Sequence, residues 1–488
     1  MKFLIYLPLI FLATGCTTLS VIDTTADPRF LIRDAFNDPK LDHAHWGVKI
    51  ESLADGEIWY QRNANRMFMP ASNQKILTSA AALHVLGPEF RYTTRLWRRG
   101  EIEGPVLRGD LIVKGNGDPT FYDRFHDDPR APFRAWAQRL LELGIRRIDG
   151  NIIGDDNSYD DQRYGYGWAL NYLDTWYAAE SGALQFNENY LDLTFTPPTS
   201  LDQDLTITPN VESAYFQIHN KTKLSTEEET RIRISRPFAS NEITVSGIVK
   251  VGTPSFERSP SIYNPTLFYV TVLKETFEAQ GIEVTGKAID CDDLTSWTFQ
   301  PKEKDLLISH ESPRLAAILK GLMKRSQNMY AETLVRTLAW HRSGLGSYER
   351  GRAEVETALA EMGIDPGTYA FMDGSGLTRY DLVSPDQIVT LLKRMRQSDH
   401  WETWKDLQPI AGVDGTLKNR MKETAAAGNV RAKTGTISNV RCLSGYVTTA
   451  DEEELVFSFM LNGHLTSSRS ADAITDKVLT LLSEYSEK

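Results

Sequence analysis

Three short motifs contain the residue types of a serine enzyme that works through a covalent intermediate. They are an S-x-x-K motif at residues 72–75, an S-x-N motif at 326–328 and a K-T-G motif at 433–435. A serine hydroxyl is a weak nucleophile until a neighbouring base takes its proton. One S-x-x-K alone carries little information in a chain of 488 residues, but the three motifs in this order indicate acyl transfer.

The first motif is predicted to supply the nucleophile and its base. Residues three apart at the start of a helix share one face, so Ser72 and Lys75 are expected to point the same way. Partial burial and nearby cations lower the pKa of a lysine, and an uncharged lysine can accept a serine proton. The N-terminus of the same helix directs unpaired N–H groups toward the region where negative charge develops. We therefore predict Ser72 as the nucleophile and Lys75 as its base.

The other two motifs are predicted to assist this reaction. Ser326 can relay a proton to a leaving amine, and Asn328 offers a donor and an acceptor to a substrate amide. Lys433, on a strand expected to be exposed, would supply a fixed positive charge for a carboxylate, and the N–H of Thr436 would complete an oxyanion hole with that of Ser72. Taken singly, these residues also fit an ordinary helix start, a helix cap and a solvated strand. Their joint occurrence favours the catalytic interpretation.

The elements that must position these motifs indicate an α/β domain interrupted by a long insertion. Residues 170–260 consist mostly of short strand-like runs with polar turns, whereas both ends of the chain are richer in helices. The expected elements are a hairpin over 46–62, strands over 429–437, 440–449 and 454–462, and helices over 74–83, 133–143, 267–280, 313–322, 329–341 and 471–484. This order predicts one split domain with a β-rich middle.

The composition excludes several classes of protein. The net charge of −11 argues against a nucleic-acid partner, which normally requires a basic face. The hydrophobic fraction of 41% is enough for packed cores. After Cys16 only Cys291 and Cys442 remain, so the chain is no disulfide scaffold; pairing of the two stays open, and two buried thiols are expected. No metal site is predicted, because His43 and His45 have no third ligand in view, and the expected acyl-transfer reaction needs no cofactor.

Residues 1–15 are predicted to form a signal peptide. Lys2 precedes an apolar run over 3–12 that is too short to span a bilayer. The run leads into Cys16 through a segment that resembles the lipobox of bacterial lipoproteins, and this resemblance implies that Cys16 carries a lipid. Thr17 after the cysteine favours the outer membrane. We expect a periplasmic, lipid-anchored protein; the alternative is an ordinary signal peptide with an incidental Cys16.

The motifs together resemble the peptidase S13 family, the D-alanyl-D-alanine carboxypeptidases/endopeptidases of the class C low-molecular-mass penicillin-binding proteins. The gap between the first two motifs is far longer than in β-lactamases, and this family has two inserted domains there. Gln327 departs from the commoner Asp in the second motif and is expected to matter little if it faces away from substrate. Further resembling segments are 70–72 (PAS), 117–120 (GDPT), 187–189 (NEN), 373–377 (DGSGL), 412–417 (GVDGTL) and 432–436 (AKTGT).

The resemblance implies a penicillin-binding transpeptidase/β-lactamase-like domain split by two nested, β-rich inserted domains. The catalytic domain would comprise residues 30–90 and 295–488. The first inserted domain would comprise 91–169 and 261–294, and the second, nested within it, 170–260. The family also places the loop at 373–377 close to the active site.

The resemblance further implies a serine D,D-peptidase of bacterial peptidoglycan, sensitive to penicillin and independent of cofactors. It would cleave terminal D-Ala-D-Ala, D-Ala–diaminopimelate cross-links or both, with peptide stems and β-lactams as binding partners. Thr434, Gly435 and Thr436 would join Lys433 in binding substrate. In the family a carboxylate of the inserted region reaches the amino group of diaminopimelate. Asp155 or Asp156 is therefore the candidate for that contact.

Two alternative functions remain open. A β-lactamase-type hydrolase shares the motifs, but the sequence has no E-x-x-L-N segment of the class A kind. A catalytically silent cell-wall binding protein is disfavoured by the intact Ser72, Lys75 and Lys433. The sequence leaves open the balance of carboxypeptidase to endopeptidase activity and whether the chain forms a homo-oligomer.

Overall fold

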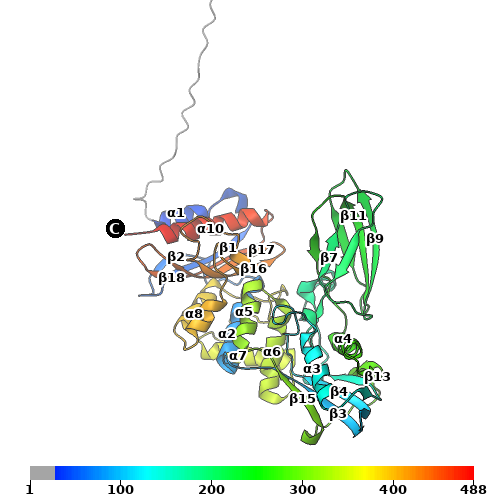
Figure 1. Ribbon diagram of the computed structural model, residues 1–488. Coiled ribbons are helices and arrows are strands. Elements are labelled where there is room, and N and C mark those ends of the chain that lie inside the picture. The colour runs from blue at the N-terminus through cyan, green and yellow to red at the C-terminus, as the bar shows by residue number, and fades with distance from the viewer. Residues whose placement is uncertain (1–27, 488) are drawn as a thin grey trace, which may run out of the picture.

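A computed structural model describes residues 28–487 as a mixed α/β chain with several separate sheets (Figure 1). Cys16 and the predicted signal peptide lie outside the described residues, so the lipid anchor stays a prediction. Within residues 28–487, none of the helices combines the length and the apolar character that crossing a membrane requires.

The main sheet joins the two ends of the chain. Its five antiparallel strands lie in the order β16-β17-β18-β1-β2. β1 pairs with β18 along its whole length, from His45 opposite Asn462 to Ser52 opposite Leu455. The domain that the insertion splits is thus closed by strands from both termini. The strands are β1 (His45–Ser52), β2 (Ile58–Arg62), β16 (Arg431–Ile437), β17 (Val440–Thr448) and β18 (Glu454–Asn462).

Helices cover both faces of this sheet, which gives three layers. In β18, Phe457 and Phe459 pack toward α1 and α10, whereas Val456 and Met460 belong to the core formed with the helices of the other face (Figure 1). Helices over both faces explain why the strand is apolar at nearly every position. The helices are α1 (Pro28–Ala35), α2 (Gln74–Leu86), α5 (Leu315–Arg325), α6 (Asn328–Ser343), α7 (Tyr348–Glu361), α8 (Pro385–Arg396), α9 (Trp401–Leu407) and α10 (Ser468–Glu484).

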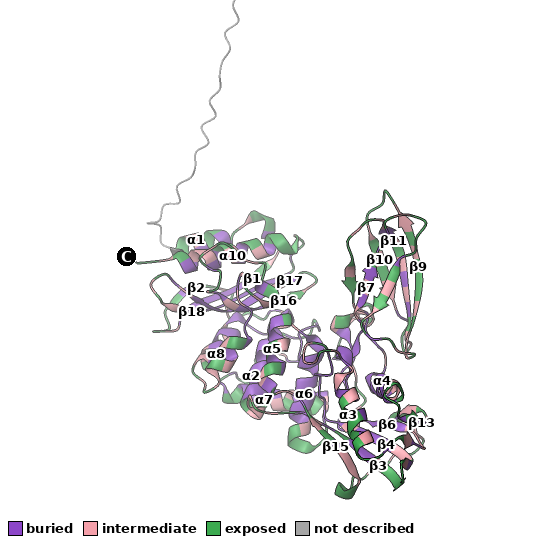
Figure 2. Cartoon of the chain, in the orientation of Figure 1, coloured by how far each residue is buried: buried purple, intermediate pink, exposed green. Residues whose placement is uncertain are grey.

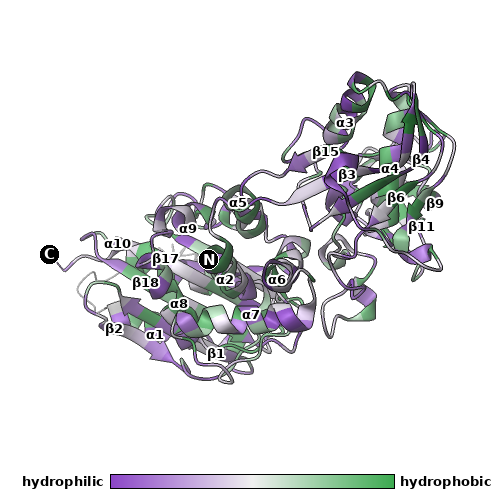
Figure 3. Ribbon diagram, turned by 90° about the horizontal axis from the view of Figure 1, so that it is seen from below, coloured by the Kyte–Doolittle hydropathy of each residue, from purple (hydrophilic) through white to green (hydrophobic). Residues whose placement is uncertain are grey.

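α2 is the central helix of the layer that carries the candidate site. Its residues from Gln74 to Leu83 are all buried, and hydrophobic side chains dominate it (Figure 3). A helix that is apolar on all sides is stable only inside a core. It ends at Gly87, whose φ of 74° is a left-handed conformation that glycine adopts without strain. Packing therefore fixes the start of α2, where the first motif lies.

The inserted region contains a second, seven-stranded sheet with helices α3 and α4 beside it. β15 pairs with β3 although it follows residue 294, where the sequence places the end of the first inserted domain. The predicted domain boundaries stay predictions. The elements are β3 (Thr93–Glu103), β4 (Val106–Gly115), α3 (Ala131–Glu142), β5 (Arg147–Ile148), β6 (Ile152–Asp155), α4 (Pro265–Ala279), β13 (Glu283–Val284), β14 (Ala288–Asp290) and β15 (Leu306–Glu311).

Residues 193–258 form two further three-stranded sheets, in the orders β10-β11-β9 and β12-β7-β8. Val245 of β11 and Phe195 of β7 share one hydrophobic cluster with Phe268 of α4, so the nested strands pack onto the rest of the insert. β9 and β10 are largely exposed or half-buried (Figure 2). The strands are β7 (Leu193–Thr196), β8 (Thr206–Pro209), β9 (Gln217–Ser225), β10 (Arg231–Ser235), β11 (Glu242–Lys250) and β12 (Phe256–Arg258).

The two cysteines of the described region are buried free thiols, as the sequence predicted. Cys291 belongs to a small cluster with Trp97 and Ile153 in the inserted sheet, and Cys442 lies in β17 within the catalytic core. Burial raises the pKa of the Cys291 thiol above its usual range and that of Cys442 to about 12. Both are therefore poor nucleophiles, and neither replaces Ser72 as a candidate.

Candidate active site

The three motifs meet at one cavity of about 390 Å³. Ser72, Ser326 and Asn328 line it together with Thr434 and Thr436 of β16. Lys75 and Lys433 are fully buried beside it, each bonded to one of the two serines. The remaining lining residues are Tyr172, Trp176, Tyr177, Arg325, Gly376, Leu377, Thr416, Ile437 and Ser438.

Ser72 lies in a single 3₁₀ turn, Ala71–Asn73, immediately before α2. Ala71 has a φ of 46°, a conformation that costs a non-glycine residue free energy and persists only where the surroundings hold it. Two glycines allow those surroundings to come close. A Cβ at Gly376 would lie 1.8 Å from the Ala71 carbonyl oxygen, and a Cβ at Gly435 would lie 2.5 Å from that of Pro70. The turn that presents Ser72 is thus held between the loop at Gly376 and strand β16 at Gly435, and at neither glycine is there room for a side chain.

Lys75 is positioned to act as the base for Ser72. Its Nζ donates to Ser72 Oγ at 2.9 Å, to Asn328 Oδ1 at 2.6 Å and to the Ser375 carbonyl oxygen at 2.7 Å. Burial lowers the pKa of Lys75 to about 7, against the opposing effect of nearby carboxylates such as Asp373. A substantial fraction of Lys75 is therefore uncharged near neutral pH and able to accept the Ser72 proton. The contact with Ser375 also confirms that the loop at 373–377 lies at the site.

Glu332 in α6 holds that loop, and sequence reasoning missed it. Its carboxylate accepts hydrogen bonds from the backbone N–H groups of Gly374 (3.1 Å) and Ser375 (2.9 Å). Burial raises the pKa of Glu332 to about 8. The available signal was its position four residues after Asn328, one helical turn along the same face. Glu332 thus supports the carbonyl group to which Lys75 is bonded.

The pKa of Lys75 predicts how acylation depends on pH. The charged ammonium form cannot accept the Ser72 proton, so the rate of acylation is expected to rise as pH increases, with a midpoint at about 7. Glu332→Gln should shift this midpoint only slightly, because Glu332, with a pKa of about 8, is mostly uncharged where Lys75 titrates. Stopped-flow acylation by a chromogenic cephalosporin measures both curves. A profile that stays flat from about pH 5 to about pH 9 would contradict the assignment of Lys75 as base.

Ser326 and Lys433 form the second bonded pair. Ser326 ends α5 in a left-handed conformation with a φ of 63°, which is uncommon for serine and is typical of functional sites. Lys433 Nζ donates to Ser326 Oγ and to the Thr434 carbonyl oxygen, each at 2.8 Å. The pair places the Ser326 hydroxyl at the wall of the cavity, with the buried amine of Lys433 bonded to it.

The expectation that Lys433 lies on an exposed strand is wrong. β16 is an edge strand of the main sheet, yet the Lys433 side chain is buried and bonded to Ser326 at the end of α5. Burial, and then the positive charge of Lys75, hold the pKa of Lys433 well below its usual range. The groups that face the cavity beside it are the hydroxyls of Thr434 and Thr416, which share a hydrogen bond of 2.8 Å.

Both the oxygen and the nitrogen of the Asn328 side-chain amide form hydrogen bonds in this structure. Its Oδ1 accepts from Lys75, and its Nδ2 donates to the Tyr177 carbonyl oxygen at 2.7 Å. Asn328 therefore links the base of the catalytic half to a segment of the inserted region. Its predicted contact with a substrate amide, and the predicted N–H groups of the oxyanion hole at Ser72 and Thr436, stay predictions.

The structure offers a reason for the unusual Gln327. Its side chain caps α6 by accepting from the Met329 N–H at 3.3 Å, and its Nε2 donates to the buried carboxylate of Glu188. Glu188 also accepts two bonds from Arg124, at 3.0 and 2.9 Å, and one from Tyr330 at 2.7 Å. An aspartate at position 327 would bring a second carboxylate to Glu188, whereas a glutamine supplies a donor. Gln327 thus faces the inserted region.

Exchanging the glutamine at position 327 with the glutamate at position 188 tests this explanation of Gln327. Gln327→Glu should destabilise the fold by about 1–3 kcal/mol and slow acylation, because it removes a donor and adds a buried like charge. Adding Glu188→Gln should recover part of both losses, since the donor and the carboxylate are then exchanged. Melting temperature and penicillin acylation rate measure the cycle. Losses that simply add would show that the two side chains are not coupled.

The structure does not bring Asp155 or Asp156 into the cavity. Asp155 accepts from Lys114 Nζ at 3.1 Å and from Trp297 Nε1 at 3.2 Å. Asp156 accepts from Thr266 Oγ1 at 2.5 Å, and neither residue lines the cavity. From the inserted region the lining residues are instead Tyr172, Trp176 and Tyr177.

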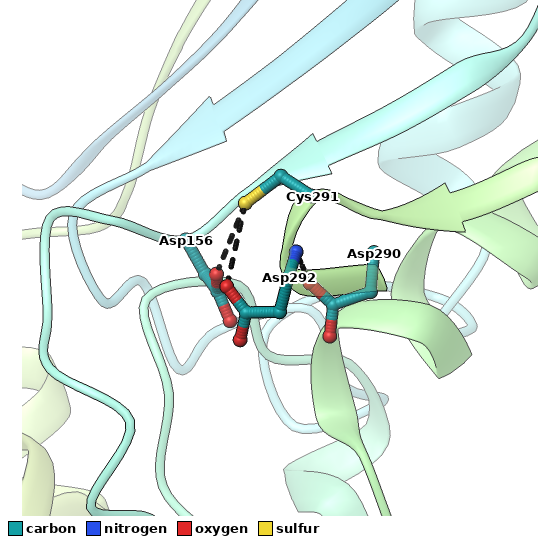
Figure 4. Close-up of side chains that lie close together, drawn as sticks. All are labelled: Asp156, Asp290, Cys291 and Asp292. Atoms are coloured by element: carbon teal, nitrogen blue, oxygen red, sulfur yellow. Dashed lines mark hydrogen bonds between the residues drawn. The ribbon is translucent and has the colours of Figure 1, made fainter. Parts of the chain in front are cut away.

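Asp156 belongs to a cluster with Asp290, Cys291 and Asp292 in the inserted domain (Figure 4). The ligand-type atoms of these four residues lie within 4.8 Å of one another. Arg163 lies against two of them, 3.3 Å from Asp290 and 3.4 Å from Asp292, and provides positive charge there. Burial raises the pKa of Asp156 to about 7. The cluster is explained as a partly buried acidic group in which Asp290 and Asp292 are paired with Arg163.

Known structures share this fold. The crystal structure of penicillin-binding protein 4 (DacB) from Haemophilus influenzae matches with a TM-score of 0.79 and 26% sequence identity, covering 93% of this chain and 99% of that one. The structure of the same protein complexed with a β-lactam matches with a TM-score of 0.73 and 25% identity, covering 92% and 97%. The chain therefore has the fold of a penicillin-binding protein, with a split catalytic domain and inserted domains, as predicted.

The sequence matches identify the family. Residues 31–485 match the D-Ala-D-Ala carboxypeptidase 3 (S13) family. The D-alanyl-D-alanine carboxypeptidase of Actinomadura sp. (strain R39) is 33% identical over 470 residues, covering 92% of this chain and 83% of that protein. The chain belongs to the D-Ala-D-Ala carboxypeptidase 3 (S13) family and is a serine-type carboxypeptidase, which confirms the resemblance read from the motifs.

Proposed function

We propose that the protein is a D,D-peptidase that removes terminal D-alanine from peptidoglycan stems through an acyl-enzyme on Ser72. The observation that carries this proposal is the bond of 2.9 Å between Ser72 Oγ and Lys75 Nζ, at a lysine whose pKa is about 7. The family and the relative from Actinomadura support the same reaction.

The residues of the cavity suffice for both halves of the reaction. Lys75 takes the proton of Ser72 as Oγ attacks the D-alanine carbonyl carbon, and the N–H groups of Ser72 and Thr436 stabilise the oxyanion. The C–N bond then breaks, and the leaving amine receives a proton through Ser326, which is bonded to Lys433. Water hydrolyses the ester by the reverse proton transfers, so Ser72 is regenerated and no cofactor is consumed.

The wall formed by β16 is proposed to bind the substrate carboxylate. Thr434 and Thr416, whose hydroxyls are bonded to each other, line the cavity, and the buried Nζ of Lys433 donates to the Thr434 carbonyl oxygen. A bound carboxylate would favour the charged form of Lys433 and so restore the cation that burial disfavours. Gly435 contributes by its lack of a side chain, because it lets β16 approach the Ser72 turn. This arrangement favours substrates with a free terminal carboxylate.

The location and the inhibitors follow from the same proposal. A related protein is known in complex with a β-lactam, which supports penicillin sensitivity here. Substrates of this kind lie outside the cytoplasm, so we propose export to the periplasm with Cys16 as the lipid anchor. A mass spectrum of the mature N-terminal peptide tests the anchor: an unmodified Cys16 would refute it.

Fluorescent penicillin separates the candidate functions. A D,D-peptidase should keep the label, a β-lactamase-type hydrolase should lose it rapidly, and a catalytically silent binding protein should never acquire it. Peptide mapping should place the adduct on Ser72, and a pentapeptide ending in D-Ala-D-Ala should release one D-alanine. An adduct on any other residue would refute the proposed nucleophile.

A further inference from the structure

A small cavity of about 210 Å³ shares one wall with the catalytic cavity, where the three motifs meet. Thr416, Thr434 and Thr436 line both cavities, so the two are continuous at these three residues. The small cavity is also lined by Arg441 of β17 and by Arg420, and a guanidinium stays charged in folded proteins. Neither arginine has a part in the reaction proposed above.

The pairing of β16 with β17 brings Arg441 to Thr436. The two residues lie directly opposite each other in this antiparallel ladder, so their side chains lie on the same face of the sheet. Arg441 Nη1 donates a hydrogen bond to Thr436 Oγ1. Because the oxygen accepts from the guanidinium, the Thr436 hydroxyl keeps its own proton to donate to a bound group. Arg441 thus leaves Thr436 as a hydrogen-bond donor at the wall of the catalytic cavity.

Arg441 is the less neutralised of the two arginines in the small cavity. Arg420 contacts two carboxylates, Asp472 at 3.3 Å and Asp476 at 2.5 Å. Among the residues that the structure describes, the only carboxylate within ion-pair distance of Arg441 is that of Asp472, at 2.5 Å. The Nε of Arg441 is buried and has no hydrogen-bond partner in the described part of the chain. Arg441 therefore keeps positive charge available for an anion in the adjoining cavity.

The lysine of the K-T-G motif leaves room for a second source of positive charge. Burial holds the pKa of Lys433 well below its usual range, so a bound carboxylate must itself favour the charged form of this amine. Arg325 also lines the catalytic cavity, but its side chain is exposed, and solvent screens its charge. A carboxylate at the threonine wall therefore meets a permanent, partly buried positive charge on the side of Arg441.

We propose that Arg441 is a positioning residue for the substrate carboxylate and acts through the hydroxyl of Thr436. It holds this hydroxyl as a donor to the carboxylate of the leaving D-alanine and adds a permanent positive charge beside it. The inference rests on the proposed function of Ser72 and deepens it, because it names a residue outside the three motifs that selects substrates with a free carboxylate. No bond forms or breaks at Arg441, so its contribution is expected in substrate binding.

Arg441→Gln tests this role with two peptides that end in D-Ala-D-Ala, one with a free carboxylate and one amidated. On the acid, kcat/KM should fall about tenfold, chiefly through a higher KM, because a charge-assisted contact is lost. On the amide, kcat/KM should stay within about twofold of the wild type. Arg441→Lys keeps the charge but not the planar fork, so it should recover part of the loss on the acid.

Arg431→Gln is the matched control. Arg431 lies in β16 five residues before Thr436, is half-buried and lines neither cavity, so this variant should match the wild type on both peptides. Asp472 keeps its contact with Arg420 in Arg441→Gln, so the substitution leaves no carboxylate unpaired there. The melting temperature verifies that the variant is folded, and Arg441→Met, which keeps the apolar stem, serves in its place if it is not.

Two results would overturn the role of Arg441. The first is an unchanged kcat/KM of Arg441→Gln on the acid, and the second is an equal loss on acid and amide, which would assign Arg441 to the fold or to the chemistry. Failure of the proposed function would look different, since the wild type would then release no D-alanine from the acid peptide and carry no penicillin on Ser72.

Discussion

Removing Ser72, Lys75 or both is expected to reduce hydrolysis of D-Ala-D-Ala peptides to the same residual level. Ser72→Ala lacks the attacking oxygen, and Lys75→Met lacks the group that accepts its proton across 2.9 Å. In groups that act as a unit, each single loss costs about as much as losing all of them, roughly 10⁴-fold to 10⁶-fold in rate. The double variant should therefore be no slower than either single variant. Release of D-alanine from a pentapeptide ending in D-Ala-D-Ala measures all three rates, because a variant without Ser72 Oγ forms no penicillin adduct.

The control for this comparison lies on the same helix. Ser79 is buried in α2, one turn beyond Lys75, but does not line the cavity, so Ser79→Ala should acylate at the wild-type rate. Lys75→Met should also melt at a lower temperature, because the acceptors at Asn328 and Ser375 lose their donor. A double variant much slower than either single variant would mean that Ser72 and Lys75 act independently.

The sequence predicted best the features that are encoded by residue types at short, local spacings. The S-x-x-K, S-x-N and K-T-G motifs predicted the residues that meet at the cavity, and the strand-like run at 454–462 was predicted with the bounds that β18 has. α8 was missed although Ser384 and Gln387 form a capping box, a signal that the sequence does contain. Such local features can be found by closer inspection of a single chain.

Other features depend on contacts between distant segments and leave no local pattern. The bond between Glu188 and Gln327 joins residues 139 positions apart, and the partner of β1 is the last strand of the chain. The burial of Lys433 has the same origin, because an edge strand is covered here by the end of α5. A single sequence does not show which segment covers the edge strand of a sheet, nor how deeply the side chains of that strand are buried. Such contacts also decide that Asp155 lies away from the cavity.

Lys433→Ala is expected to separate substrates that end in a carboxylate from those that end in an amide. A D-alanine carboxylate at Thr434 and Thr416 would form a charge-assisted hydrogen bond with the buried Nζ of Lys433. Losing one partner of a desolvated pair costs about 2–5 kcal/mol, or roughly thirty-fold to several thousand-fold in kcat/KM. Penicillin carries a carboxylate in the matching place, so its acylation should slow as well. A substrate amidated at its C-terminus should lose much less.

Ser326→Ala gives the comparison that decides between the two roles open to Lys433. Lys433 donates to Ser326 Oγ at 2.8 Å, so it can act through the proton relay as well as through the carboxylate. Ser326→Ala removes the relay and should slow acid and amide substrates equally, because the leaving amine is the same in both. If Lys433→Ala also slows both substrates equally, Lys433 acts through Ser326 and the carboxylate-binding role has to be abandoned. A loss confined to the acid substrate would assign Lys433 to the carboxylate, with Ser326 delivering the proton on its own.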